Sequence, residues 1–219
     1  INMQKTTIDY LKSLKKNNNK EWFEQNKSSF ELAKSDFLQL VDRLIVQLTK
    51  IDSRYGELKA KDCIFRQYRD IRFSKDKTPY KTNMGAAFHL DGKKGGKAAF
   101  YFHLEPGNSF VGGGLWMPDA EKLKKVRQEI DYNFEKFKKI VSHKSFVETF
   151  GALSTEDQLK NAPKGYENDH KAIAFLRLKS YVAAQPLSDK ELTDAIEKKI
   201  GQSFKAIAPF IHFLNESIG

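Results

Sequence analysis

The side chains best suited to chemistry lie in one basic segment, FRQYRDIRFSKDKTPYKTNMGAAF, which runs from Phe65 to Phe88. Arginine guanidinium groups bind phosphate or carboxylate through paired hydrogen bonds, and lysine adds a point charge. So much positive charge is costly on a folded surface unless an anion meets it. The segment therefore predicts an anion-binding site whose contacts are Arg66, Arg69, Arg72, Lys75, Lys77 and Lys81.

Two other interpretations of the basic segment stay open. In a strand, Asp70 would share a face with Arg66 and Arg72, and it can organise the arginines that flank it. The segment is then an internal Arg–Asp network that orders a loop and binds nothing. The third interpretation is direct catalysis, with Asp70 or Asp76 as the base beside an arginine clamp.

A glycine triplet, Gly112–Gly113–Gly114, falls inside a predicted strand. Glycine within a strand marks a bulge or a close approach of another chain segment. Close packing against a large residue such as Trp116 or Tyr101 explains the triplet. The alternative is a ligand that contacts the exposed backbone of all three glycines. No GK[ST] follows, which excludes a nucleotide-hydrolase phosphate loop.

Two similar tetrapeptides, FHLD at 88–91 and FHLE at 102–105, each place a histidine and a carboxylate on one strand face. Paired across a hairpin, they would offer nitrogen and oxygen ligands to a divalent cation. Isolated strand histidines with polar neighbours explain the same pattern. No metal site is assigned, and no cofactor is indicated.

Composition favours a globular protein with anionic partners. The 219 residues are 40% hydrophobic and 12% aromatic, which can fill a sizeable core. The formal net charge of +10 favours a phosphate-bearing ligand or nucleic acid as the partner. A lysine-rich surface on helices explains the same balance without any partner.

Cysteine content and hydropathy bound the location. Cys63 is the only cysteine, which excludes an intrachain disulfide or a cysteine-based zinc site and fits a reducing compartment. The sequence has no run of about 18 apolar residues and no signal-peptide core, so no membrane contact and a cytoplasmic location are expected. The sequence does not indicate an oligomeric state.

Apolar spacing predicts an α+β fold with a largely antiparallel sheet flanked by helices, in a single domain over residues 3–219. A stripe with a seven-residue repeat, from Phe23 to Ile51, predicts one long helix. The predicted helices are 6–16, 20–51, 118–140, 143–150, 168–178, 188–200 and 202–217. The predicted strands are 63–73, 83–90, 98–105, 109–116 and 180–187.

Four segments resemble the DUF2461 family of conserved hypothetical proteins. They are NNNKEWF at 17–23, RDIRFSKDKTPYKTNMGA at 69–86, HLEPGNSFVGGGLWMP at 103–118 and LRLKSYVAAQPLSDKEL at 176–192. They occur in the order of the family and cover nearly the whole chain. The resemblance implies a full-length α+β domain and brings neither an activity nor catalytic residues.

Three functions compete at this point. The favoured one is a binding protein for a phosphorylated small molecule or a nucleic acid, which contacts it through the basic segment. The second is an enzyme that acts on an anionic small molecule with an arginine clamp and an aspartate acid or base. The third is a structural or partner-binding domain, which a large exposed apolar patch would favour.

Overall fold

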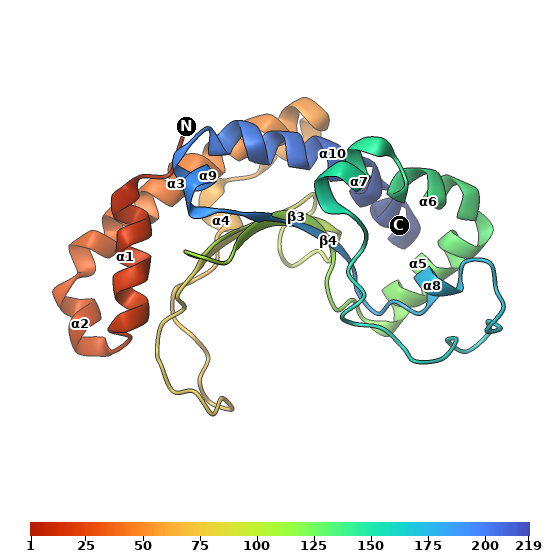
Figure 1. The fold of residues 1–219 in the computed structure, drawn as a ribbon, viewed down its shortest axis with the longest axis horizontal. Helices are drawn as coiled ribbons and strands as arrows, with labels where there is room; N and C mark the ends of the chain where they lie inside the picture. Colours follow the sequence, from red (N-terminus) through yellow and green to blue (C-terminus); the bar gives the residue numbers. More distant parts are fainter. The chain divides into compact units, whose positions relative to one another are not determined.

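The computed structural model describes residues 1–219 and contains ten α-helices, one short 3-10 helix and four strands (Figure 1). The helices are α1 (Lys5–Lys16), α2 (Lys20–Gln25), α3 (Lys27–Ile51), η1 (Ser53–Glu57), α4 (Ala60–Cys63), α5 (Ala120–Tyr132), α6 (Phe134–Val141), α7 (Lys144–Phe150), α8 (Ile173–Leu176), α9 (Asp189–Thr193) and α10 (Ile196–Ile218). No helix combines the length and the apolar character that crossing a bilayer requires.

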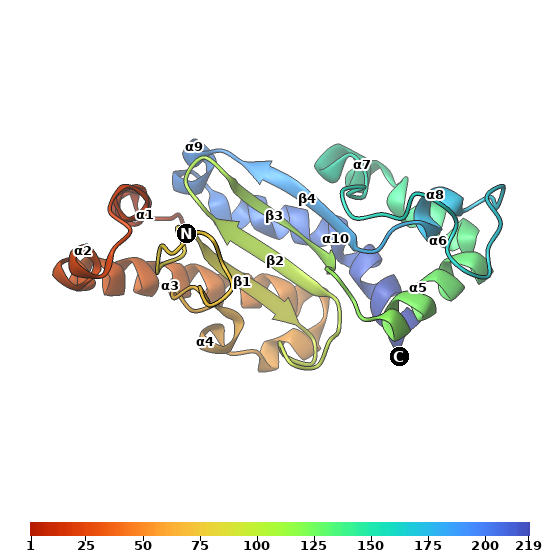
Figure 2. The same cartoon turned by 90° about the horizontal axis from the view of Figure 1, so that it is seen from below.

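The four strands form one antiparallel sheet in the order β1-β2-β3-β4, which confirms the predicted α+β class (Figure 2). The strands are β1 (Met84–His89), β2 (Ala99–Leu104), β3 (Ser109–Leu115) and β4 (Tyr181–Leu187). The first three follow one another along the chain, and β4 joins β3 after a long connection that carries α5 to α8. All four match predicted strands within two residues at each end.

Contacts divide the chain into two compact units that interleave in sequence. Unit 1 comprises residues 1–88, 101–111 and 186–202, and unit 2 comprises residues 89–100, 112–185 and 203–219. All four strands and helix α10 contribute residues to both units. The single domain expected from the sequence stays a prediction.

Strand β2 shows why the sheet forms where it does. Phe100, Phe102 and Leu104 are buried, whereas Tyr101 and His103 between them are partly exposed, which is the period-two alternation of a strand with one covered face. In unit 1, the Phe102 ring stacks on the ring of Phe37 from α3, with 5.8 Å between ring centroids. In unit 2, the rings of Phe100 and Phe204 meet edge to face at 5.1 Å.

Two predicted helices are each broken by an asparagine. The 20–51 helix is wrong as one element, because Asn26 ends α2 and begins α3 while its side chain donates to the Trp22 carbonyl. The 118–140 helix is interrupted in the same way at Asn133, whose side chain donates to Glu129. Asparagine competes for local hydrogen bonds in this way, and the apolar stripe does not reveal it.

Two other predicted boundaries are also wrong. The predicted break near residue 201 is absent, because α10 runs through Gly201 and Pro209. The 63–73 segment is not a regular strand, since only Ile64 and Tyr68 in it form isolated antiparallel bridges, to Ala86 and Tyr80.

Side chains are excluded from the glycine triplet in β3 because the backbone of the neighbouring strands lies too close. A Cβ at Gly112 would overlap the carbonyl oxygen of Ala183, and one at Gly114, whose φ is +131°, would overlap that of Tyr181. A Cβ at Gly113 would meet the Ala99 carbonyl in the same way. Of the two neighbours expected from the sequence, Trp116 is 77% exposed and Tyr101 is not among the residues nearest to the three glycines, so packing against either ring is not the reason.

Gly112→Ala is expected to destabilise the protein by about 1–3 kcal/mol or more, because the backbone of β4 cannot yield to the new methyl group. Gly201→Ala is the matched control, since its Cβ would meet nothing closer than Gln47 Cγ at 3.5 Å. That variant should gain roughly 0.5–1 kcal/mol from better helix propensity. Urea denaturation of both variants tests the contrast, and equal stability would contradict it.

Candidate anion-binding site

The basic segment forms a long hairpin that we call the basic arm, residues 64–83. In Figure 1 it extends from the sheet between α4 and β1. Backbone hydrogen bonds pair its two sides: Arg69 N–H donates to the Pro79 carbonyl at 2.9 Å, and Lys81 N–H to the Gln67 carbonyl at 2.8 Å. The buried Gln67 side chain also donates to the Lys81 carbonyl. Residues 70–78 form the tip, where no such pairing continues.

The basic arm is fastened to the corner between α1 and α2 through Asn18. The Asn18 amide donates to the Tyr80 carbonyl at 2.8 Å, and its oxygen accepts from the Tyr80 N–H at 3.1 Å. The Tyr80 ring is buried and stacks on Phe23 at 4.0 Å between centroids. Asn19 caps α2 by accepting from Trp22 N–H. The asparagine run therefore ends one helix, holds the arm and starts the next helix.

Arg69 ties the tip of the basic arm together. It is 25% exposed at its side chain, donates to Asp76 at 2.8 Å and also reaches the Thr78 carbonyl at 3.0 Å. Asp76 accepts from the backbone and hydroxyl of Thr78, and these bonds, together with the Arg69 charge, hold the pKa of its carboxyl below the ordinary value. Arg69 thus has internal partners for its guanidinium group, and an anion contact by Arg69 stays a prediction.

Asp70 forms a two-bond pair with Arg72, at 3.0 and 2.8 Å. These bonds, the Arg72 backbone N–H and the nearby Arg66 charge lower the pKa of Asp70. The hydrogen bonds of Asp70 to arginine go to Arg72 alone. Its role as organiser of the arginines stays a prediction. The pair is largely exposed, with Arg72 at 76%.

Arg66, Lys75 and Lys77 of the basic arm form no ion pair with a carboxylate. The Lys81 ammonium lies 5.6 Å from the Phe65 ring centroid. Arg66 and Lys75 are exposed. Lys77 donates to the Ile71 carbonyl at the tip, at 2.9 Å. Counting all six cations against Asp70 and Asp76 leaves a formal charge of +4 on the arm. Positive charge is therefore spread from its root to its tip.

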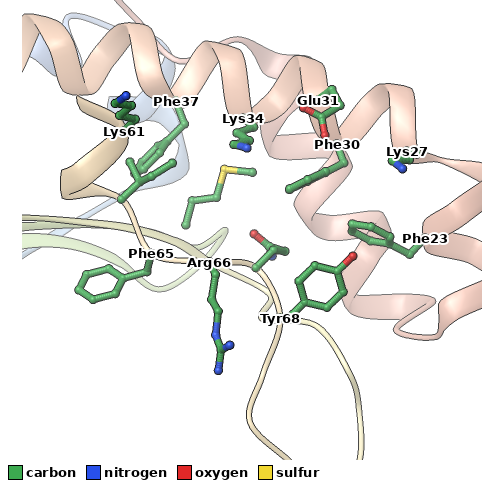
Figure 3. A pocket seen from close by; sticks show the side chains of 13 residues that line it. Phe23, Lys27, Phe30, Glu31, Lys34, Phe37, Lys61, Phe65, Arg66 and Tyr68 are labelled. Atoms are coloured by element: carbon green, nitrogen blue, oxygen red, sulfur yellow. The ribbon is translucent and has the colours of Figure 1, made fainter. Parts of the chain in front are cut away.

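A groove of about 470 Å³ lies where the basic arm leaves the body of unit 1, and we call it the root groove (Figure 3). Its apolar lining comes from α2, α3, the arm and β1 and includes Phe23, Phe30, Phe37, Phe65, Tyr68 and Met84. Its charged lining residues are Lys27, Glu31, Lys34, Lys61 and Arg66. Four cations thus face one carboxylate around an aromatic interior.

Sequence reasoning did not identify the lysines of the root groove. The signal was present, because Lys27 and Lys34 are seven residues apart and each precedes a stripe phenylalanine, Phe30 or Phe37, by three positions. Residues three apart are neighbours on a helix surface. The sequence does not reveal that α3 lies close to the arm, because this proximity arises from tertiary packing.

A chain of hydrogen bonds crosses the partly exposed face of β2. The Tyr101 hydroxyl meets His103 Nδ1 at 2.9 Å, and His103 Nε2 meets Glu105 at 3.2 Å. With a neutral imidazole, Nε2–H donates to the carboxylate and Nδ1 accepts from the phenol. Phe110 stacks on the imidazole at 4.7 Å, and Thr82 of the arm donates to Glu105 at 3.1 Å. We call Tyr101, His103 and Glu105 the relay.

The protonation of the relay is set by its surroundings. Burial, with the Glu105 charge, raises the pKa of Tyr101 to about 12, so the phenol keeps its proton. Burial would raise the pKa of Glu105, but hydrogen bonds from His103, Asn108 and Thr82 outweigh it and lower that pKa. The relay therefore holds a proton on the phenol and a negative charge on Glu105, next to the return side of the arm.

A comparison with known proteins connects these features to a family. A family model described as a conserved hypothetical protein, DUF2461, matches residues 6–213. The chain belongs to the DUF2461 family. No curated protein matches it, and no solved structure does. The match spans the arm, the root groove and the relay, and confirms the resemblance that the four segments indicated.

In this DUF2461 protein, His89 and His103, the two histidines considered as metal ligands, form hydrogen bonds within the protein. His89 Nδ1 donates to the Lys97 carbonyl at 2.8 Å, and His103 belongs to the relay. No group of three or more histidine, cysteine, aspartate or glutamate side chains has a metal-binding arrangement. The glycine triplet belongs to unit 2, whereas the arm belongs to unit 1, so backbone contacts of Gly112, Gly113 and Gly114 with a ligand stay a prediction.

Asn18→Ala is expected to lower the free energy of unfolding by about 1–3 kcal/mol, because it leaves the backbone N–H and carbonyl of buried Tyr80 without partners. Amide hydrogen exchange at Tyr80 and Lys81 should accelerate. Asn17→Ala is the matched control, since Asn17 makes an exposed bond to the Ser13 carbonyl, and it should change stability by less than about 0.5 kcal/mol. Unchanged exchange in Asn18→Ala would refute the fastening role.

Glu105→Gln should destabilise the protein by about 1–2 kcal/mol at pH 7, because the charged acceptor of three side chains is lost. The pKa of Glu105 is lowered from 4.5, so its contribution is complete above that pH and is lost as the pH falls through the folded-state pKa. Urea denaturation of wild type and variant from pH 7 to 3 should show the two converging. A constant difference would contradict this assignment.

Proposed function

We propose that this DUF2461 protein binds a phosphate-bearing polyanion, a nucleic acid strand, through the basic arm. One observation carries the proposal: Arg66, Lys75 and Lys77 have no carboxylate partner in an arm whose backbone is held by internal hydrogen bonds and by Asn18. Binding to a segment that is already ordered avoids much of the entropy cost of ordering it.

The distribution of charge favours a chain of phosphates over a single phosphate group. Arg66 lies at the root of the arm, whereas Lys75 and Lys77 lie in its tip. A single small anion would need its cations to converge on one point, while successive phosphates of a strand meet cations spread along a surface. Arg72 and Lys81 add to the same field, with Asp70 fixing the orientation of Arg72.

The alternative of an enzyme that acts on an anionic small molecule has one observation in its favour, the relay. Asp70 and Asp76, the catalytic bases expected from the sequence, are poorly suited to that role, because both carboxyls are hydrogen bonded and have lowered pKa values. A weak base of this kind accepts a substrate proton reluctantly. An enzyme built on this chain would use His103 with Glu105, beside Thr82 of the arm.

Exposed aromatic side chains on the arm are also relevant to a partner-binding domain. Phe73 at the tip is 95% exposed and lies beside Arg72, with the guanidinium carbon 5.8 Å from its ring centroid. An aromatic ring flanked by cations suits a nucleic acid strand, which offers base faces and phosphates together. The apolar exposure on the arm is therefore compatible with the same polyanion.

The triple variant Arg66→Gln, Lys75→Gln, Lys77→Gln tests the arm. We expect binding of a fluorescent 20-nucleotide thymidine oligomer to weaken at least about tenfold at low salt. The slope of log affinity against log salt should fall in magnitude by about 2, since each lost phosphate contact of a single strand removes roughly 0.7. Fluorescence anisotropy at several salt concentrations measures both quantities.

The control carries the same loss of charge elsewhere, as Lys124→Gln, Lys139→Gln, Lys198→Gln, at exposed lysines outside any ion pair. It should bind within about twofold of wild type if the arm, rather than net charge, is responsible. Equal weakening in both triple variants would reject the arm as the contact. Failure of the wild-type protein to bind DNA, RNA or nucleotides at low salt would reject the function itself.

A further inference from the structure

The root groove combines an aromatic interior with an excess of positive charge. Its interior is aromatic, and its charged lining carries three lysines and Arg66 against Glu31 alone. Its volume, about 470 Å³, lies in the range of small-molecule sites. We infer that the root groove binds an unpaired nucleobase of a nucleic acid strand whose phosphates lie on the basic arm. This inference rests on the proposed function.

Among the rings that meet at Phe23, that of Tyr68 leaves surface for a further ring. Phe23 packs against Phe30 at 5.1 Å and against Tyr68 at 6.0 Å, with interplanar angles of 48° and 56°. Phe23 itself is buried, with its ring stacked on Tyr80, whereas Tyr68 remains 53% exposed. Figure 3 shows Tyr68 beside Phe23 and Phe30. A planar base on the Tyr68 ring would cover apolar surface that now faces solvent.

The charges around the rings select the occupant. None of Lys27, Lys34, Lys61 and Arg66 forms an ion pair within 4 Å, so the groove has a positive potential that an apolar peptide would not satisfy. In Figure 3 the Arg66 side chain extends away from the aromatic rings, whereas Lys27 and Lys34 come from α3 on the other side of the groove. A nucleotide within a strand matches this pattern, because its base lies between two phosphates.

The ligand must present an unpaired base. In a duplex both faces of each base are stacked and its edges are paired, so a base can enter a side pocket only after it leaves the helix, at an energetic cost. A single strand offers its base faces without that cost. The root groove therefore assigns single-stranded nucleic acid as the partner class and Tyr68 as the exposed ring on which the base stacks.

The test compares oligomers that share a backbone but differ in bases. Fluorescence anisotropy measures binding of the 219-residue protein to a 12-nucleotide thymidine oligomer and to an abasic oligomer of equal length and charge. The thymidine oligomer should bind about tenfold more tightly. Tyr68→Leu should abolish this difference and leave abasic binding unchanged. Tyr132→Leu is the matched control, because Tyr132 is an exposed tyrosine, 71%, outside the groove, and it should behave as wild type.

The charge of the groove is tested separately with Lys27→Gln, Lys34→Gln. This variant should weaken both oligomers, whereas the Lys124→Gln, Lys139→Gln control should weaken neither. Equal affinity of wild type for the two oligomers, or no effect of Tyr68→Leu, would overturn the base site and leave the arm as a backbone binder. Absence of binding to either oligomer at low salt would overturn the proposed function and this inference together.

Two further binding measurements distinguish a single strand from a duplex and from a free nucleotide. A thymidine–adenosine duplex of 12 base pairs should bind more weakly than the single strand, and tighter duplex binding that is insensitive to Tyr68→Leu would overturn the inference. Thymidine monophosphate should compete only at millimolar concentration, since it lacks the neighbouring phosphates. Displacement of the oligomer by micromolar monophosphate would assign the root groove to a free nucleotide and overturn the strand as its partner.

Discussion

The two hydrogen bonds between the Asn18 amide and the Tyr80 backbone are the contact on which the arm and everything attached to it depend. A side-chain amide here takes the place of a neighbouring peptide group and satisfies a buried donor and a buried acceptor at once. Ordering each arm residue costs roughly 1–2 kcal/mol of conformational free energy, so a fixed point outside the hairpin is needed. With Tyr80 fixed, its ring stacks on Phe23. The return side of the arm then places the Thr82 hydroxyl within hydrogen-bond distance of Glu105.

Charge within the arm is divided between holding its shape and facing outward. Asp70 and Asp76 lie in the tip and bind Arg72 and Arg69. Exposed ion pairs contribute little to stability, but two-bond geometry fixes the direction of a guanidinium group. The carboxylates are too few to neutralise the arm. The internal network and the anion site are therefore compatible, because the first orients part of the charge that the second would use.

The sequence specified those elements whose residues carry their own signal. Strands β1 to β4 were predictable because their alternation and turn residues are local, and the site segment stood out by its charge. The breaks at Asn26 and Asn133 were not, because the apolar stripe continues across them and only a side-chain hydrogen bond stops the helix. The root groove could not be predicted for a different reason: Lys34 and Tyr68 line the same groove only after α3 and the arm have packed.

The glycines show how the same residue type serves unrelated demands. Gly85 in β1 leaves room for the Tyr101 hydroxyl, since a Cβ there would lie 2.7 Å from it, so the small residue permits the relay. The β3 triplet instead permits neighbouring strands to approach its backbone. A glycine run in a chain that also carries a basic segment suggests phosphate binding by composition alone, yet close packing already requires each of the three glycines. Tyrosine placement, rather than glycine content, distinguishes the proposed site from a tightly packed sheet in this chain. Tyr80 is buried and holds the arm, and Tyr101 is hydrogen bonded in the relay. Tyr68 is exposed and lines the root groove together with lysines that form no ion pair.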